Sequence, residues 1–219
     1  MKNIYIIGTS GFASEVTEYI KDNNDYNIKG YFDMTNQDYL KYKYDAPYLG
    51  HENEFKFTSS DNIVIAIANA ILREKIYTIL KAKNINFPHI IHKSSFVSPN
   101  TSIGEGAILC PFVTLTSNIT IGKNFHANIY SYIAHDCIIG NNVTFAPNVK
   151  CNGNVIIEDN VYIGTGTIIH QGKTNKPLII GSGATIAAGS VITKSIATGK
   201  TMFGNPAIEL TKENLKRRR

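Results

Sequence analysis

His135 and Asp136 are the neighbouring side chains best suited to acid–base chemistry in this sequence. A histidine changes its charge near neutral pH, and an adjacent carboxylate can hold its tautomer and raise its basicity. Asn128 lies seven residues earlier and can place an amide nearby or across a contact between subunits. We predict these three residues as the catalytic group, although a solvated histidine without a role is the alternative for any single one.

A zinc site made of three histidines is the competing interpretation. His126, His135 and His170 occupy three different positions of the six-residue period described below, so their side chains are not expected to meet. We therefore predict no metal. Cys137 is expected to face the interior, where a thiol is inert, and no Ser–His–Asp nucleophile set stands out.

A second group of candidate residues lies in the first third of the chain. Gly8 and Gly11 stand between a predicted strand and helix, where backbone N–H groups can face a phosphate. Asp33 ends the next strand and is placed to accept a hydrogen bond from a ribose or base. A strand–helix turn without a ligand explains the glycines equally well. Asn69 and Arg73, after the third strand, add a nucleotide-binding candidate at the same sheet edge.

The element that positions His135 is a six-residue repeat. Every sixth residue from Ile91 through Ile169 is apolar, and the register resumes at Ile180 after one interruption. A fixed short period of this kind indicates a β-helix. Each hexad forms a short strand and a turn, and three hexads close a triangular coil whose neighbours stack about 4.8 Å apart.

Strands alternating with helices precede the repeat. The predicted strands and helices are, in order, residues 4–7 (strand), 14–21 (helix), 28–32 (strand), 63–68 (strand) and 70–83 (helix). This alternation is typical of a small parallel α/β domain of the Rossmann-like kind.

Three segments follow from these patterns. We predict an α/β domain over residues 1–90, a β-helix over residues 91–207 and a basic tail over residues 208–219. Residues 170–179 interrupt the repeat, and this insertion is either a lid, a contact between subunits or tolerated surface.

Charge and composition narrow the class of protein. The net charge of +5 is concentrated in residues 216–219, so nucleic acid is not an expected partner. Three cysteines without a pairing pattern suggest a reducing compartment. No stretch has the length of a signal peptide or a membrane span, and we expect a cytoplasmic, soluble protein without membrane insertion.

Four motifs together resemble the bacterial sugar acetyltransferases. They are GTSGFA at 8–13, AIAN at 66–69, AHDCIIG at 134–140 and GNPA at 204–207. This family includes sialic acid O-acetyltransferases and the UDP-amino-sugar N-acetyltransferases that make bacillosamine-type sugars, and residues 63–154 look particularly close to the second branch. The resemblance implies a left-handed parallel β-helix, a homotrimer, and acetyl-CoA bound between adjacent prisms.

The resemblance also implies roles for individual residues. His135 would be the base and Asp136 would raise its basicity, with Asn128 close by. The acceptor nucleotide would bind at the first domain. The substrate contacts expected there are Ser10, Gly11, Phe12, Asp33, Met34 and Ala68, together with Asn69 and Arg73 after the third strand. Acetyl-CoA contacts would fall near Thr144, Thr165 and Ala188.

The chain departs from the family at acceptor-facing and cofactor-facing positions. These are Phe12 and Thr144, where histidine is common, Met34, where aspartate is common, and Ala68, where glycine is usual. The sequence therefore determines the type of reaction better than the identity of the acceptor sugar.

The main prediction is an acetyl-CoA-dependent N-acetyltransferase. It would act on the amino group of a nucleotide-activated amino-deoxy sugar, UDP-linked or similar, for surface polysaccharide or glycan biosynthesis. A sugar O-acetyltransferase with a sialic-acid-like acceptor would show the same motifs. A non-catalytic trimeric scaffold or binding module is the alternative of a different class.

Overall fold

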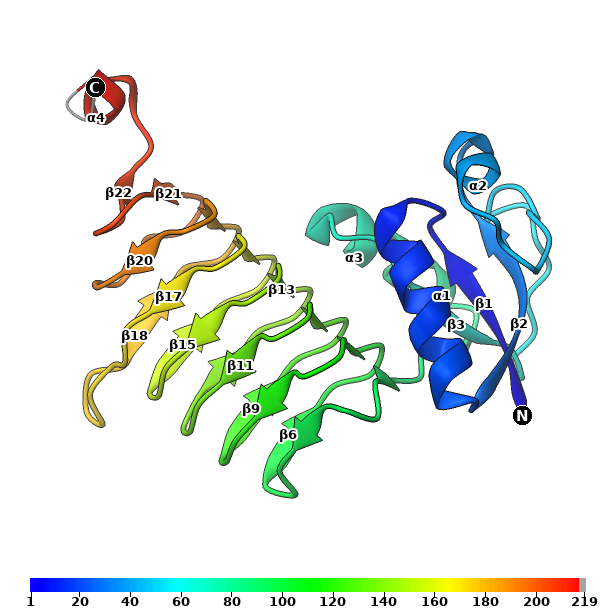
Figure 1. The fold of residues 1–219 in the computed structure, drawn as a ribbon, viewed down its shortest axis with the longest axis horizontal. Coiled ribbons are helices and arrows are strands. Elements are labelled where there is room, and N and C mark those ends of the chain that lie inside the picture. Colours follow the sequence, from blue (N-terminus) through cyan, green and yellow to red (C-terminus); the bar gives the residue numbers. More distant parts are fainter. Residues whose placement is uncertain (217–219) are drawn as a thin grey trace.

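The computed structural model describes residues 1–216, which form two bodies in succession along the chain (Figure 1). The first is a three-stranded parallel sheet with helices, and the second is a left-handed parallel β-helix, as the repeat and the resemblance predicted. The coils of the β-helix stack away from the first sheet, and the N-terminus lies at the opposite end of the molecule from α4. Within residues 1–216, no helix is both long and apolar enough to cross a membrane.

The first sheet has the strand order β2–β1–β3, with β1 in the centre. Its elements are β1 (Lys2–Ile7), α1 (Gly11–Asn23), β2 (Tyr26–Phe32), α2 (Gln37–Lys41), β3 (Asn62–Ile65) and α3 (Ala70–Lys81). Side chains alternate along β1, so Ile4 and Ile6 pack with α1 while Ile7 packs with α3 on the other face.

The β-helix has three flat faces, each a parallel sheet except for one antiparallel pair, β21 with β22, at the C-terminal end. The first face consists of β4 (Ile90–Ile91), β7 (Ile108–Leu109), β10 (His126–Ala127), β13 (Thr144–Phe145), β16 (Tyr162–Ile163), β19 (Thr185–Ile186), β21 (Thr201–Phe203) and β22 (Ile208–Glu209). The second face consists of β5 (Phe96–Val97), β8 (Thr114–Leu115), β11 (Tyr132–Ile133), β14 (Lys150–Cys151), β17 (Ile168–Ile169) and β20 (Val191–Ile192). The third face consists of β6 (Thr101–Ile103), β9 (Ile119–Ile121), β12 (Ile138–Ile139), β15 (Val155–Ile157) and β18 (Leu178–Ile180).

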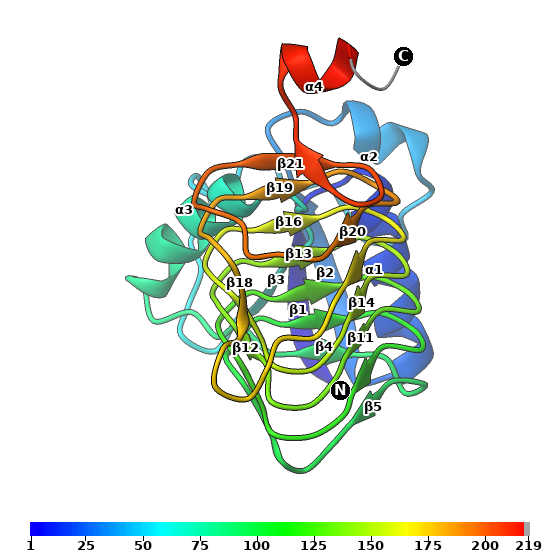
Figure 2. The same ribbon diagram turned by 90° about the vertical axis from the view of Figure 1, so that its left-hand side faces the viewer.

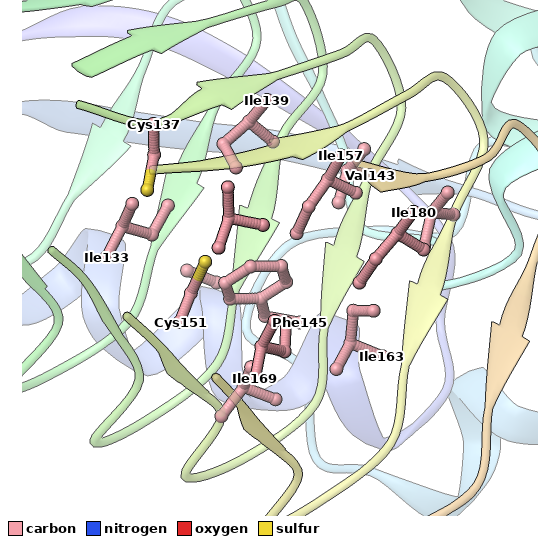
Figure 3. Packing of buried hydrophobic residues seen from close by; sticks show 14 of the residues in the cluster. Ile133, Cys137, Ile139, Val143, Phe145, Cys151, Ile157, Ile163, Ile169 and Ile180 are labelled. Carbon is pink, nitrogen blue, oxygen red and sulfur yellow. The ribbon is translucent and has the colours of Figure 1, made fainter. Parts of the chain in front are cut away.

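The hexad register determines which side chains fill the prism. His126 pairs with Thr144 and Ala127 with Phe145, so each inward residue stacks on its equivalent one coil earlier. Figure 3 shows Phe145 among the inward aliphatic side chains. Cys137 is buried, as predicted, and it is one of three free buried cysteines in the described chain.

Turn residues with positive φ line the three corners of the prism. Asparagine is the commonest non-glycine type at these corners, since its short polar side chain tolerates the left-handed region better than most. The corner between the first and second faces carries Phe112, Tyr130 and Asn148; the corner between the second and third carries Asn118, Asp136 and Asn154; the corner between the third and first carries Asn124, Asn142 and Asn160.

Several element boundaries differ from the prediction. Helix α1 is longer than residues 14–21, because Ser10 acts as its N-cap and Asn24 ends it in the left-handed conformation. Helix α2 lies in a polar, tyrosine-rich segment where no helix was predicted. The predicted basic tail begins with β22 and continues as α4 (Lys212–Lys216), and its residues 217–219 lie outside the described residues. Residues 170–177 leave the β-helix as a loop closed by a bridge between Lys173 and Lys176.

The first domain packs on the first face of the β-helix. Ile90, Ile108 and Cys110 share one buried cluster with Ala13, Val16 and Ile20 of α1. Figure 2 shows the first domain behind the stacked coils, with α1 and α3 at two sides of them. This contact places the strand ends of the first sheet close to the middle coils of the β-helix.

Candidate active site

His135 and Asp136 lie together at the corner that joins the second and third faces. The imidazole is 59% exposed, and its Nδ1 lies 2.7 Å from Asp136 Oδ2. Asp136 adopts φ 59°, the left-handed conformation found at the other corners of the prism. Asn118 Nδ2 donates to the other oxygen, Asp136 Oδ1, at 2.5 Å, and this bond and the His135 contact lower the pKa of the carboxyl.

The tautomer of His135 follows from this contact. An ionised carboxylate accepts hydrogen bonds only, so Nδ1 carries the proton that Asp136 accepts. Nε2 of the neutral ring is then the free acceptor, which is the form needed to take a proton from a substrate. The local geometry therefore fits the role predicted for His135.

Gly153 leaves the space that the imidazole occupies. It lies one coil after His135, and a Cβ on it would be 2.7 Å from His135 Cε1 and 2.8 Å from Nε2. An alanine at this position therefore displaces the exposed ring, since the three atoms nearest to its Cβ all belong to the imidazole.

We expect Gly153→Ala to lower kcat of acetyl transfer by roughly 10- to 100-fold, because a displacement near 1 Å misaligns the base. The melting temperature of Gly153→Ala should equal that of Ser117→Ala, a control substitution at an exposed residue of the same corner. Steady-state kinetics with thermal melts of both variants measure this. Unchanged kcat in Gly153→Ala would show that the position of the His135 ring does not matter.

A cavity of about 150 Å³ lies where the first domain meets the first face, and we call it the junction cavity. Phe12 and Ala68 line it from the first domain, and Asn128, Thr144 and Thr165 line it from three successive coils. Five residues predicted from separate parts of the sequence therefore lie around one space. Ala188 is exposed one coil beyond Thr165 and is not among the lining residues.

The polar side chains of the junction cavity differ in how many hydrogen-bonding groups they leave available for a ligand. Asn128 Oδ1 accepts the Ile129 N–H at 2.7 Å, which leaves its Nδ2 donors for a ligand. Thr144 Oγ1 is already engaged, because it donates to Ala68 O at 3.1 Å and accepts from Arg73 Nη2 at 2.8 Å. Asn128 is thus the better placed of the two to contact a ligand.

His126 also lines the junction cavity, and its position was only partly foreseen. It points outward from the prism, as predicted, but the first domain covers it, with the Phe12 ring centroid 5.4 Å away. The side chain is 2% exposed, and neither ring nitrogen has a hydrogen-bond partner within residues 1–216. Burial, followed by the charge of Arg73, lowers the pKa of His126 well below its usual value.

Arg73 is buried and lines neither the junction cavity nor the cavity at the strand ends described below, so a direct nucleotide contact for it stays a prediction. It is 0% exposed, and its guanidinium donates five hydrogen bonds. Two acceptors, Asn124 O and Asn142 O, belong to neighbouring corner turns of the β-helix, and two more, Ile67 O and Ala68 O, belong to the loop after β3. Burial lowers its pKa to about 9, so Arg73 stays charged at neutral pH.

A second cavity of about 210 Å³ lies at the carboxyl ends of β1, β2 and β3, and we call it the strand-end cavity. Asp33 and Met34, two of the predicted nucleotide contacts, line this cavity. It lies at the sheet edge where nucleotides bind in open α/β sheets. Thr9 donates to Asp33 Oδ2 through its N–H at 3.0 Å and its hydroxyl at 2.8 Å. These bonds hold the carboxylate at the end of β2.

Besides Lys75 of α3, three polar residues of the strand-end cavity were missed in the sequence. His51, Glu52 and Asn53 line it from the irregular segment after α2. No period or motif marks this segment, and only the folded connection brings it back to the strand ends.

The remaining predicted residues lie at helix starts. Ser10 is the N-cap of α1 without a side-chain capping bond, and Gly11 is the first residue of that helix. Asn69 Oδ1 caps α3 by accepting the Leu72 N–H at 2.9 Å. Neither cavity includes these three among its lining residues.

One chain does not bring the two halves of the candidate site together. His135 lies at the corner after the second face, whereas the junction cavity lies along the first face and the corner before the second face. The full width of the strand face that contains β11 separates them. His170 follows β17 of the second face, so it lies at the same corner as His135 but two coils farther along, and the second face separates it from His126 on the first face.

Comparisons with known proteins match both bodies. The PglD N-terminal domain family matches residues 3–80, and the bacterial transferase hexapeptide family of six repeats matches residues 118–153. A GDP-perosamine N-acetyltransferase of Escherichia coli O157:H7 is 53% identical over 146 residues, which are 67% of this chain and 66% of that protein. The match thus spans just under two thirds of that relative's length.

Solved structures resemble the chain over nearly its whole length. WeeI from Acinetobacter baumannii AYE is 42% identical with a TM-score of 0.86, covering 96% of this chain and 100% of that one. The acetyltransferase domain of PglB from Neisseria gonorrhoeae FA1090, solved with acetyl coenzyme A, is 24% identical with a TM-score of 0.81, covering 95% and 99%. The second likeness concerns the fold alone.

Proposed function

We propose the activity from one premise: this chain belongs to the bacterial sugar acyltransferase family that joins a PglD N-terminal domain to hexapeptide repeats. It transfers the acetyl group of acetyl-CoA to the amino group of a nucleotide-linked amino-deoxy sugar. The observation that carries the proposal is the exposed His135–Asp136 pair, in a chain 53% identical to a GDP-perosamine N-acetyltransferase. GDP-perosamine is the first acceptor to test.

His135 acts as the general base of the transfer. As the amine nitrogen attacks the thioester carbon, the N–C bond forms and the amine proton passes to His135 Nε2. The tetrahedral intermediate then collapses, the C–S bond breaks, and the proton passes to the departing CoA thiolate. A backbone N–H or the Asn128 amide stabilises the oxyanion.

The two domains divide the substrates between them. Residues 1–90 bind the acceptor and residues 91–207 bind acetyl-CoA. Ile67 lines the strand-end cavity and the next residue, Ala68, lines the junction cavity, so a nucleotide in the first cavity can place its sugar in the second. Ser10 and Gly11, at the N-terminus of α1, are placed to bind the diphosphate.

A homotrimer completes the site. His135 of one subunit faces the junction cavity of its neighbour, which explains why one chain holds the two halves apart. Acetyl-CoA lies between adjacent prisms, along the corner that carries Thr165 and Ala188. The cytoplasm, where acetyl-CoA and nucleotide sugars occur together, is the proposed compartment.

An acceptor screen with purified full-length protein tests the activity. Acetyl-CoA is incubated with GDP-perosamine, with a UDP-4-amino sugar, or with free or CMP-linked sialic acid, and released thiol is measured. We expect thiol release with an amino sugar, with the product acetylated on nitrogen. Release only with sialic acid would favour O-acetylation, and neither release nor thermal stabilisation by millimolar CoA would favour the scaffold.

A further inference from the structure

We infer that Glu52 recognises a guanine base in the strand-end cavity, so the acceptor is a GDP-linked sugar. The inference rests on the proposed function for the identity of the acceptor site. It extends that function by assigning the base to one residue, which the nucleotide pattern of the sequence did not include.

The strand-end cavity has the shape and lining of a base-binding slot. The aliphatic part of its wall comes from β1, the loop after β3 and helix α3, and includes Ile7, Ile67, Leu72 and Ile76. Aliphatic side chains can cover the flat faces of a base. Its position at the carboxyl ends of parallel strands, beside the Gly8 turn and Asp33, is where nucleotides bind in open α/β sheets.

Glu52 is the unusual residue of this slot. It is 6% exposed although it is a carboxylic acid, and within residues 1–216 its one recorded polar neighbour is His51 Nδ1 at 3.2 Å. The same nitrogen accepts the Asn53 N–H at 3.1 Å, so its lone pair is already used and it has no proton to donate to Glu52. A buried carboxylate requires donors, because burial without them is costly. The Glu52 oxygens are not among the fully buried polar atoms without a partner, so they stay accessible from the cavity that Glu52 lines, where a ligand can supply the donors.

Guanine supplies the donors that a carboxylate needs. Its N1–H and its N2 amino group are adjacent and parallel, and they match the two oxygens of one carboxylate in a bidentate pair. Uracil and thymine have a single N–H between two carbonyl oxygens, so a carboxylate that meets the N–H also meets a repelling oxygen. Adenine presents an acceptor at N1. A carboxylate at this cavity therefore favours guanine over uracil, thymine and adenine.

A cation at the same cavity agrees with this choice. Lys75 of α3 lines the strand-end cavity, and guanine O6 is an acceptor that lysine commonly contacts. Asp33, held by Thr9 at the end of β2, remains available for the ribose hydroxyls.

Nucleotide binding to the full-length protein tests the inference without requiring catalysis. GDP, IDP and UDP are titrated by calorimetry, because IDP differs from GDP only by the missing N2 amino group. We expect UDP to bind roughly 100-fold more weakly than GDP and IDP roughly 10-fold more weakly, as the loss of a bidentate contact implies. UDP binding as tightly as GDP, or no binding of GDP, would overturn the assignment.

Two substitutions connect the preference to the residue. Glu52→Gln replaces one acceptor oxygen by a donor and should weaken GDP at least about 10-fold while leaving UDP unchanged. Glu54→Gln changes an exposed carboxylate two residues away and should alter neither affinity. Full GDP affinity in Glu52→Gln contradicts the inference. If that variant does not fold, the comparison of GDP, IDP and UDP on the unchanged protein still decides.

The guanine assignment and the proposed acetyl transfer can fail independently of each other. Selective GDP binding through Glu52 without thiol release would refute acetyl transfer and leave the base assignment intact. Thiol release with a UDP-linked sugar in preference to its GDP counterpart would support acetyl transfer and refute the guanine assignment.

Discussion

We expect His135→Ala to lower kcat of acetyl transfer by at least about 100-fold, the lower end of what a general base contributes. Without the imidazole, the amine proton has no positioned acceptor when the tetrahedral intermediate forms. The side chain is exposed and its recorded polar contact is with Asp136, so its removal leaves the fold and the trimer intact. Thiol-release kinetics, thermal melting and size-exclusion chromatography measure the three properties together.

The control for this variant is His170→Ala, since His170 is an exposed histidine at the same corner as His135 but two coils farther along the β-helix. It should keep the wild-type kcat. Retained activity in His135→Ala would remove His135 from the mechanism. Loss of activity together with dissociation of the trimer would assign it a structural role instead.

Mixed trimers test whether neighbouring subunits share the site. His135→Ala and Asn128→Ala subunits are each expected to form nearly inactive trimers. When they are unfolded and refolded together, some interfaces pair an intact His135 with an intact Asn128 of the neighbour, and part of the activity should return. If the site lay within one chain, every site in the mixture would carry a defect and no activity would return.

Arg73→Met is expected to lower the free energy of unfolding by about 3 kcal/mol or more. The guanidinium satisfies backbone oxygens of both domains, and each buried acceptor left without a donor costs roughly 1–3 kcal/mol. Methionine fills similar space but donates no hydrogen bond. Urea unfolding with the free energy extrapolated to water measures the loss.

Two companion variants separate hydrogen bonding from charge. Arg73→Lys keeps the charge but has only three donors, which cannot match the guanidinium's five bonds, so its stability should lie between wild type and Arg73→Met. Lys75→Met, an exposed lysine of the same helix, should unfold like the wild type when no nucleotide is present. If Arg73→Met matched Lys75→Met, the buried hydrogen bonds would contribute nothing measurable.

Local patterns in the sequence predicted much of the architecture. The hexad register places Ile133 inward, buries Cys137 and leaves His135 exposed, and the structure shows all three. A short period is readable because every coil repeats the same contacts with its neighbours at a spacing of 18 residues. The α/β alternation was readable for a similar reason, while α2 escaped detection in a segment without periodicity.

The candidate site was predicted in part. Asp33 and Met34 lie at one cavity, and Phe12, Ala68 and Asn128 lie at another, as residues that share a site should. The sequence could not show that Arg73 has no free donor, because its acceptors Asn124 and Asn142 are 51 and 69 residues away. Contacts of this range follow from how two domains pack, and no local period records them.

Tertiary structure alone decided what is buried between the domains. By sequence, His126 is one more outward residue of the repeat, yet the first domain covers it and removes its ring from water. Glu52 lies in a stretch without any pattern, yet the fold returns it to the strand ends, where it is 6% exposed and lines a cavity. The sequence determined the exposed acid–base pair because a repeat defines inside and outside. Packing between distant segments determined which polar groups lost their solvent and now need a ligand.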